Sequence, residues 1–266
     1  MPTPAPTSDN EQRTTSDAPA HHIPPHLYWF SKLVQVPLMA LATGFFGTAS
    51  LICGLWGRSG GQQHLVARAW ARVMLRIALV PVTVIDVQNL PAETAVYASN
   101  HLSYMDTPVL FARLPFQFRI LAKQGLWKIP FIGWYLRRSG QVPIDSSNAR
   151  SAVAGLLRGV AALRAGMPLV VFPEGSRTPH GGLQPMASGA AFMAIRAQVP
   201  LVPIALIGTY GLLPIHVYAL RPRPCKIVVG TPISTAGLTT RDADALTAQL
   251  YAAIEHLYST YYDPAA

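Results

Sequence analysis

Short apolar runs alternate with amphipathic segments along the carboxyl-terminal two thirds of the chain. The apolar runs are bounded by turn-forming residues and predict strands over Val82–Val87, Ala95–Ser99, Phe118–Ala122, Gln141–Ile144, Leu169–Phe172, Leu201–Leu206 and Lys226–Val229. The amphipathic segments predict helices over Thr107–Leu114, Leu126–Arg137, Ser147–Ala165, Gly189–Gln198 and Thr240–Tyr261. This alternation indicates an α/β layered domain with a largely parallel central sheet flanked by helices.

A long uncharged segment precedes that domain. Leu33–Gly57 runs 25 residues without a charge, and as a helix it would be about 37 Å long, against a hydrocarbon core of about 30 Å. Tyr28 and Trp56 stand at its two ends, where interfacial aromatic residues are common. We therefore expect a membrane-embedded helix. Pro37 and several glycines permit a kink, so a helix that enters one leaflet without crossing is the alternative.

The next segment, Gln62–Val80, has the pattern of an amphipathic helix. Its basic side carries Arg68, Arg72 and Arg76, and its apolar side carries Val66, Trp70, Val73, Met74 and Ile77. Beside an apolar segment, this pattern predicts an interfacial helix on an anionic membrane surface. An ordinary helix with a solvated charged face is the alternative.

These patterns divide the chain into three parts. Residues 1–26 are rich in Pro, Thr, Ser and Ala and predict a disordered tail. Residues 27–80 are expected to form the membrane-anchoring helices, and residues 81–266 the α/β domain. Residues Gly57–Gly61 match the G-x-S-x-G pattern of a hydrolase nucleophile, but they follow an apolar helix and not a strand, so we predict a turn.

The charge distribution favours anionic partners. The chain has a net charge of +9. Between Thr107 and Thr240 it has fourteen Lys and Arg residues but only two acidic ones, Asp145 and Glu174. No nucleic-acid-binding motif accompanies this excess, so we expect a phosphorylated substrate and anionic membrane lipids, and no nucleic acid. Cys53 and Cys225 are the only cysteines, which excludes a disulfide framework and a cysteine-rich metal site.

Two residues suited to proton transfer follow the predicted strand Ala95–Ser99. His101 and Asp106 are five positions apart, so they would point away from each other on a helix but can meet across a strand-to-helix turn. Histidine changes charge near neutral pH, and a carboxylate beside it fixes its tautomer; together they can deprotonate an alcohol. The alternative is that Asp106 caps the following helix and His101 is an idle loop residue.

A second turn follows the predicted strand Leu169–Phe172. Arg177 offers a planar fork for a phosphate, and the amides around Gly175 and Ser176 can approach an anion closely. Glu174 is expected to order this loop or to bind the substrate backbone. The carboxyl ends of strands are where open α/β sheets bind ligands, which places both turns at one candidate site.

These residues resemble motifs of the glycerolipid acyltransferases, in particular the 1-acyl-sn-glycerol-3-phosphate (lysophosphatidic acid) acyltransferase type. Asn100–Asp106 matches N-H-x4-D and Phe172–Arg177 matches F-P-E-G-[ST]-R. Gly140–Asp145 and Val202–Ala205 match two further elements, although Ser146 stands where the family usually has arginine. The four elements occur in the family order and cover roughly Arg76 to Val229.

The resemblance implies transfer of an acyl group from a thioester to the sn-2 hydroxyl of 1-acyl-glycerol-3-phosphate, which makes phosphatidic acid in phospholipid biosynthesis. It implies His101 as the general base, Asp106 as its partner, and Lys123 or the amides around Gly140 as oxyanion donors. The expected substrate-binding residues are Asn100, Gly140, Glu174, Gly175, Ser176 and Arg177. No cofactor and no metal are expected; acyl-CoA or acyl carrier protein would bring the acyl group as co-substrate.

The expected location is the cell inner membrane, with the catalytic domain on the cytoplasmic face. Arg58, Arg68, Arg72 and Arg76 follow the apolar segment closely, whereas Lys32 alone stands just before it. Two alternatives stay open. In the first, the acceptor is another lysolipid, such as a lyso-aminolipid. In the second, the protein is a catalytically inactive membrane scaffold, which Ser146 would favour.

Overall fold

The structure is a computed structural model that describes residues 23–54, 60–129, 132–145 and 148–263. The predicted tail lies almost wholly outside these residues, as do Gly57–Ser59 of the G-x-S-x-G match and Ser146. Pro25 and His26, placed in the tail by sequence, already belong to the first helix, α1. Proline is well suited to this first helical position, because its missing N–H would have no partner there.

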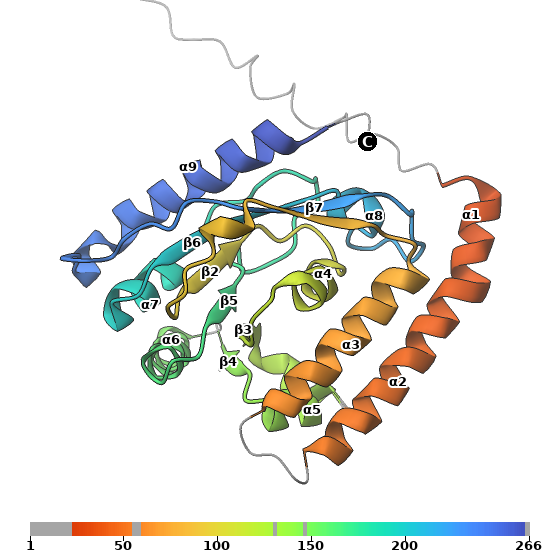
Figure 1. The fold of residues 1–266 in the computed structure, drawn as a ribbon, viewed down its shortest axis with the longest axis horizontal. Helices are drawn as coiled ribbons and strands as arrows, with labels where there is room; N and C mark the ends of the chain where they lie inside the picture. Colours follow the sequence, from red (N-terminus) through yellow and green to blue (C-terminus); the bar gives the residue numbers. More distant parts are fainter. Residues whose placement is uncertain (1–22, 55–59, 130–131, 146–147, 264–266) are drawn as a thin grey trace, which may run out of the picture.

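Seven strands form one sheet among the described residues, in the order β1-β7-β6-β2-β5-β3-β4 (Figure 1). The strands are β1 (Val82–Ile85), β2 (Val96–Ser99), β3 (Arg119–Lys123), β4 (Val142–Ile144), β5 (Leu169–Val171), β6 (Leu201–Ile207) and β7 (Cys225–Val229). Every neighbouring pair is parallel except β6 with β7, which is antiparallel. The predicted α/β fold with a largely parallel sheet is therefore confirmed.

Helices cover both faces of the sheet (Figure 1). On one face lie α6 (Ala149–Arg164), α7 (Gly189–Ala197) and α9 (Ala243–Tyr261), and on the other α3 (Gly61–Ile77) and α4 (Asp106–Arg113). Alternate residues of β2 enter the two cores: Tyr97 packs with residues of α3 and α4, whereas Val96 and Ala98 pack with residues of α6, α7 and α9. The whole of β2 is buried, as expected for a central parallel strand.

The predicted helix Leu126–Arg137 is two elements, the 3₁₀ segment η3 (Gln124–Lys128) and α5 (Ile132–Arg138). The residue before a proline is driven out of the helical region, and Ile129, which precedes Pro130, is extended. The short helix α8 (Thr209–Leu212) was not predicted, and the remaining 3₁₀ turns are η2 (Val87–Asn89) and η4 (Thr240–Asp242).

One helix of the described chain, Pro25–Cys53, is long and apolar enough to cross a membrane by length and composition. It consists of α1 (Pro25–Phe30), a π-helical turn η1 (Ser31–Gln35) and α2 (Val36–Cys53). The wide turn comes just before Pro37, whose ring cannot fit a regular helical turn.

One side of this long helix is fastened to the rest of the protein. The buried Ser31 hydroxyl accepts a hydrogen bond from the Leu220 amide at 2.8 Å, and the buried Gln35 side chain donates to the Ile77 carbonyl at 2.9 Å. Further along the helix, the Thr43 hydroxyl accepts a hydrogen bond from the Trp70 indole at 3.2 Å. The opposite side is apolar and exposed, with Leu33, Leu41 and Phe45 each about 70% accessible.

The burial of α3 corrects the expectation that the apolar side of this helix faces lipid. Its residues Ala67, Ala71, Met74 and Leu75 are buried, and α3 packs between α2 and α4. The apolar side of α3 is therefore occupied by protein and not by lipid, while Arg72 and Arg76 on its basic side are exposed. Exposed large apolar residues lie along the whole helix Pro25–Cys53, whereas Leu65 is the one large apolar residue of α3 that is so exposed.

We predict that replacing Leu33, Leu41 and Phe45 with Ser will release the protein from membranes washed with carbonate, because these side chains contribute exposed apolar surface and little to the core. The unchanged protein should stay in the pellet. Val153→Ser with Leu157→Ser, on the exposed side of α6, is the matched control and should also sediment. Quantitative release of the unchanged protein would refute the embedded helix.

Candidate active site

The loop between β2 and α4 begins with a buried asparagine. The Asn100 side-chain amide donates to the Leu206 carbonyl at 2.9 Å, and its oxygen accepts from the Leu206 amide at 2.7 Å. These two bonds fix the loop to β6 at the carboxyl end of β2. Because the Asn100 amide is fully buried and engaged by Leu206, it positions the loop in this structure; its binding of substrate stays a prediction.

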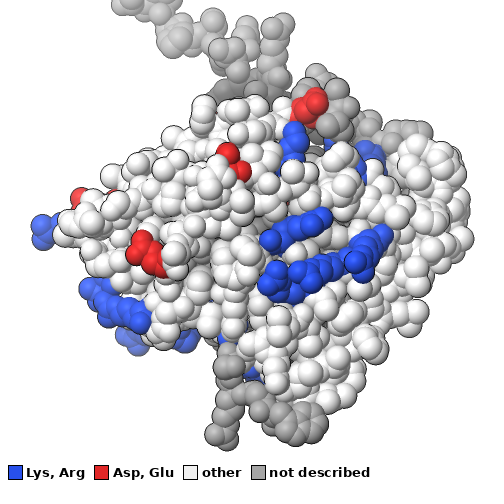
Figure 2. Space-filling model, viewed as in Figure 1, with Lys and Arg blue, Asp and Glu red and all other residues white. Residues whose placement is uncertain are grey.

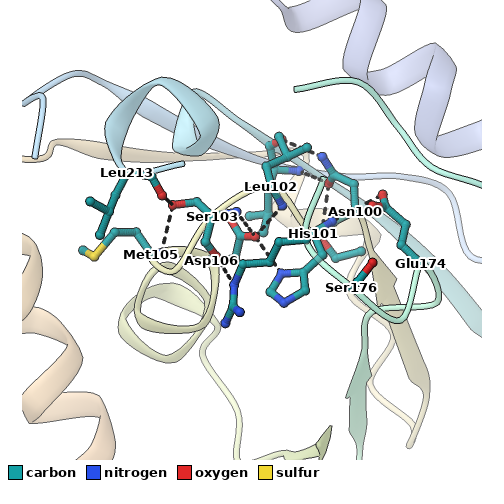
Figure 3. Close-up of polar contacts among 12 residues, drawn as sticks. Asn100, His101, Leu102, Ser103, Met105, Asp106, Glu174, Ser176 and Leu213 are labelled. Carbon is teal, nitrogen blue, oxygen red and sulfur yellow. Dashed lines mark hydrogen bonds and ion pairs between the residues drawn. The ribbon is translucent and has the colours of Figure 1, made fainter. Parts of the chain in front are cut away.

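The same loop brings His101 and Asp106 together (Figure 3). The Nδ1 atom of His101 lies 2.8 Å from Oδ2 of Asp106. That oxygen also accepts the backbone amides of Leu102 at 2.7 Å and Ser103 at 2.8 Å. Asp106 is buried and is the first residue of α4; Met105 holds the N-cap position. Asp106 therefore closes the loop and orients the histidine, and it does not act as the helix cap.

The imidazole of His101 is held on its flat side as well. It stacks on Phe172 with ring centroids 4.0 Å apart and an interplanar angle of 16°. Because Nδ1 faces a carboxylate, the neutral ring carries its proton there and presents the lone pair of Nε2. No residue in the described part of the chain hydrogen-bonds to Nε2, and the His101 side chain is 12% exposed. The geometry is that of a positioned general base.

The loop after β5 packs directly against the histidine. Oε1 of Glu174 accepts the His101 amide at 3.3 Å, and the Thr178 amide donates to the His101 carbonyl at 2.9 Å. Gln184 donates to Oε2 of Glu174 at 3.4 Å and to the Ser176 carbonyl at 3.3 Å. Burial raises the pKa of Glu174 from 4.5 to about 7, and the hydrogen bond from the His101 amide opposes that rise.

Arg177 reaches the same loop from the other side. Its Nε donates to the Ser103 carbonyl at 3.2 Å, and its guanidinium lies 4.3 Å from the ring centre of Tyr104. Burial lowers the pKa of Arg177, while the charge of Asp106 opposes that shift, and an arginine stays cationic under such conditions. With Nε engaged, the terminal nitrogens are the part of the fork left for an anion.

Of the two amides predicted to meet an anion, one is already used. Gly175 adopts a left-handed conformation, with φ of 72°, and its amide donates to the Phe172 carbonyl at 3.1 Å. No described residue accepts the Ser176 amide. Ser176 is thus the better placed of the two.

The two predicted oxyanion donors lie at opposite ends of the strands. Lys123 ends β3 and is exposed at the same edge as His101, with β5 between β3 and β2. Gly140 precedes β4, so it lies towards the amino ends of the strands, where its nearest neighbour is the Arg119 side chain. Its φ of 71° suits a tight turn. The structure does not bring Gly140 to His101.

An apolar cavity of about 290 Å³ begins beside the loop, at Thr107. It runs between α2, α3, α4, β3 and α5, and its other lining residues include Phe46, Trp70, Phe111, Ile120, Ala122, Leu126, Ile132 and Leu136. The sequence did not predict this cavity, because its walls come from segments that are distant along the chain. Its lining adjoins the loop of the base through Thr107, the residue that follows Asp106.

Sequence reasoning also missed Tyr104, Gln184 and the stacking role of Phe172. Tyr104 and Phe172 lie inside the two motifs, and an aromatic residue within a motif that carries His or Arg was the available signal. No sequence signal indicated Gln184, because its contact with Glu174 depends on how the loop folds back.

Known proteins resemble this chain over much of its length. An acyltransferase family model matches residues 81–207. The chain is 32% identical over 216 residues to the 1-acyl-sn-glycerol-3-phosphate acyltransferase of Saccharomyces cerevisiae, covering 79% of this chain and 71% of that one. It is 36% identical over 156 residues to the chloroplastic 1-acyl-sn-glycerol-3-phosphate acyltransferase BAT2 of Brassica napus, covering 57% of this chain and 44% of the plant protein.

A solved structure has the same fold. The 1-acyl-sn-glycerophosphate (LPA) acyltransferase PlsC of Thermotoga maritima superposes with a TM-score of 0.73 at 23% identity, covering 86% of this chain and 95% of that chain. His101, Asp106 and Arg177 fall at the carboxyl edge of the sheet that both share. On the family match and the similarity to the yeast protein over most of both lengths, this chain belongs to the acyltransferase family.

Proposed function

We propose that this protein transfers an acyl group from a thioester to the sn-2 hydroxyl of 1-acyl-glycerol-3-phosphate, which makes phosphatidic acid. The observation that carries the proposal is the His101–Asp106 pair, with Nε2 open, in a loop to which Arg177 is hydrogen-bonded. The yeast, plant and Thermotoga proteins that this chain resembles are named for that activity. An inactive scaffold would have no need of so closely held a base.

The pair supports direct transfer without an acyl-enzyme. Nε2 of His101 takes the proton of the acceptor hydroxyl while the hydroxyl oxygen attacks the thioester carbonyl. The tetrahedral intermediate collapses, the carbon–sulfur bond breaks, and the thiolate leaves with the proton returned from His101. Asp106 stabilises the imidazolium that forms between these steps. Lys123 is proposed to stabilise the oxyanion, supported by its place at the same edge of the sheet.

Arg177 is proposed to hold the acceptor phosphate. The Ser103 carbonyl and the Tyr104 ring fix the plane of its guanidinium, so its terminal nitrogens are oriented before a ligand arrives. Bidentate contact between arginine and phosphate is stronger and more directional than contact with lysine. The Ser176 amide and the loop ordered by Glu174 would complete the phosphate end of the site, whereas a neutral lysolipid gains nothing from this fork.

The outer side of α1 and α2 is proposed to rest in one leaflet. The long helix packs lengthwise on α3, so crossing the bilayer would draw α3 and part of the α/β domain into the hydrocarbon. The apolar cavity at Thr107 suits a fatty acyl chain arriving from that leaflet. Acyl-CoA or acyl carrier protein would approach from the cytoplasm, at the inner membrane, as expected from the basic residues that follow the apolar segment.

The function is tested by acceptor choice. Purified protein should acylate 1-acyl-glycerol-3-phosphate in preference to a lyso-aminolipid. Arg177→Lys keeps the charge and loses the fork, so we expect the KM for the phosphate acceptor to rise by about tenfold, with little change for a neutral acceptor.

Arg196→Lys, on an exposed arginine of α7, is the matched control and should leave both acceptors unaffected. Equal losses for the two acceptor types in Arg177→Lys would mean that Arg177 supports the fold or the transition state and not the phosphate. Absence of acyl transfer to any lysolipid would reject the proposed function.

The raised pKa of Glu174 makes a prediction for stability against pH. The folded protein holds this proton up to about pH 7 and the unfolded chain releases it near pH 4.5, so the free energy of unfolding should fall as pH rises between those values. Glu174→Gln removes this term. The variant should therefore gain stability relative to the parent from pH 5 to pH 8, by about 1–2 kcal/mol after solvent screening.

Denaturant unfolding at several pH values measures the difference. Glu255→Gln, on the exposed side of α9, is the control and should show no such trend. A difference between Glu174→Gln and the parent that does not change with pH would show that Glu174 titrates as an ordinary carboxyl.

A further inference from the structure

A second basic site lies where α3 and α4 end. A groove of about 600 Å³, here called the arginine groove, is lined by Arg72, Arg76 and Arg113 together with Leu75, Leu79, Val80, Pro81 and Ala112. On the face of the molecule drawn in Figure 2, basic side chains gather near the centre. None of these residues belongs to the site around His101.

The charge of the groove is not balanced by the protein. Its three arginines are exposed, no Asp or Glu among the described residues lines it, and none of the three forms an ion pair within the described chain. Arg76 and Arg113 stand in the last turns of α3 and α4, where a cation stabilises the negative end of a helix. That role accounts for single arginines but not for three that converge on one hollow, which is an arrangement suited to a phosphate.

An exposed leucine at the rim adds an apolar element. α3 ends in a Schellman turn, in which the Val80 amide donates to the Leu75 carbonyl at 3.0 Å and the Leu79 amide to the Arg76 carbonyl at 3.1 Å. Leu79 occupies the left-handed position of this turn, with φ of 56°, where glycine is the usual residue. Its side chain is 59% exposed. A strained, exposed leucine beside three arginines suits a surface that has both phosphates and hydrocarbon.

The groove also adjoins the helix with the exposed apolar side. Gln35 donates to the carbonyl of Ile77, two residues before Leu79, so the α3 end of the groove is fastened to the amino-terminal part of that helix. There the helix exposes Trp29 and Leu33, and Lys32 lies over the rings of Tyr28 and Tyr218. Aromatic and basic residues at the end of an apolar helix are typical of the interface between headgroups and hydrocarbon.

We propose that the arginine groove binds the phosphate of an anionic phospholipid in the bilayer on which α1 and α2 rest. The groove is separate from the proposed acceptor site, because Asp106 and Arg113 stand at opposite ends of α4, about 10 Å apart along its axis. A lipid held there fixes the rotation of the domain about its apolar helix. The apolar helix supplies affinity for any bilayer, and the groove supplies preference for an anionic one.

Vesicle partition tests this proposal without substrate, and therefore independently of acyl transfer. The full chain is mixed with vesicles of phosphatidylcholine alone or of phosphatidylcholine with phosphatidylglycerol. We expect the combined variant Arg72→Gln, Arg76→Gln, Arg113→Gln to bind the neutral vesicles as the parent does. Binding to the anionic vesicles should fall on the order of a hundredfold, at about fivefold for each arginine near the surface.

A control variant loses the same three charges elsewhere. Arg164→Gln and Arg196→Gln change α6 and α7, which cover the other face of the sheet, and Arg241→Gln changes η4, which contacts α7. We expect this control to change anionic binding by less than about threefold. An equal loss in both variants would show that only net charge matters and would overturn the proposal, as would full binding by the groove variant.

Two further arms separate other occupants. Displacement from the anionic vesicles by inorganic phosphate that is no greater than displacement by chloride at equal ionic strength would show that the groove does not recognise a phosphate. A groove variant that binds anionic vesicles normally but loses turnover with acyl carrier protein, and not with acyl-CoA, would identify an acidic protein as the occupant. Either result would overturn the lipid assignment.

Leu79→Gly keeps the turn and all three charges, and we expect it to weaken partition into vesicles severalfold. Unchanged partition would contradict contact of Leu79 with the bilayer.

Discussion

The site depends on one buried carboxylate oxygen. Oδ2 of Asp106 accepts three hydrogen bonds, from the His101 ring and from the amides of Leu102 and Ser103. A buried carboxylate is costly unless its oxygens find donors, so these contacts favour the closed loop over any open form. Asp106 also begins α4, where the positive end of the helix favours its charge. Loop, helix and base are therefore set by the same interaction.

The parallel sheet gathers the other parts around this oxygen. β2 and β5 are neighbours and parallel, so the loops that follow them meet, and the backbone of His101 bonds to Glu174 and Thr178 on the second loop. Asn100 fastens the first loop to β6 on the opposite side. The helices α2 and α3 then enclose the apolar cavity, which places a chamber for hydrocarbon beside a polar edge suited to phosphate.

Much of this arrangement could be predicted from local sequence. Strand and helix periodicity located the seven strands and the main helices to within a few residues, and the spacing of His101 and Asp106 required a strand-to-helix turn. Local sequence could not predict that Asn100 is used by Leu206, 106 positions away, or that the apolar side of α3 is covered by α2 and α4. For Gly140, the motif identified the residue but not its end of the strand, and the structure shows it serving a turn beside Arg119.

The coupling of His101 and Asp106 is measured most directly by the turnover of His101→Ala, Asp106→Asn and the double variant with a phosphate acceptor. General-base catalysis typically contributes about 10²–10⁴ in rate, so His101→Ala should lower kcat by that order. Asp106→Asn should lower it too, and the double variant should be little slower than His101→Ala, because the pair acts as a unit. Thermal melting of each variant, with His256→Ala on α9 as control, separates turnover from folding. Near-normal turnover by folded His101→Ala, or losses that multiply in the double variant, would contradict this account.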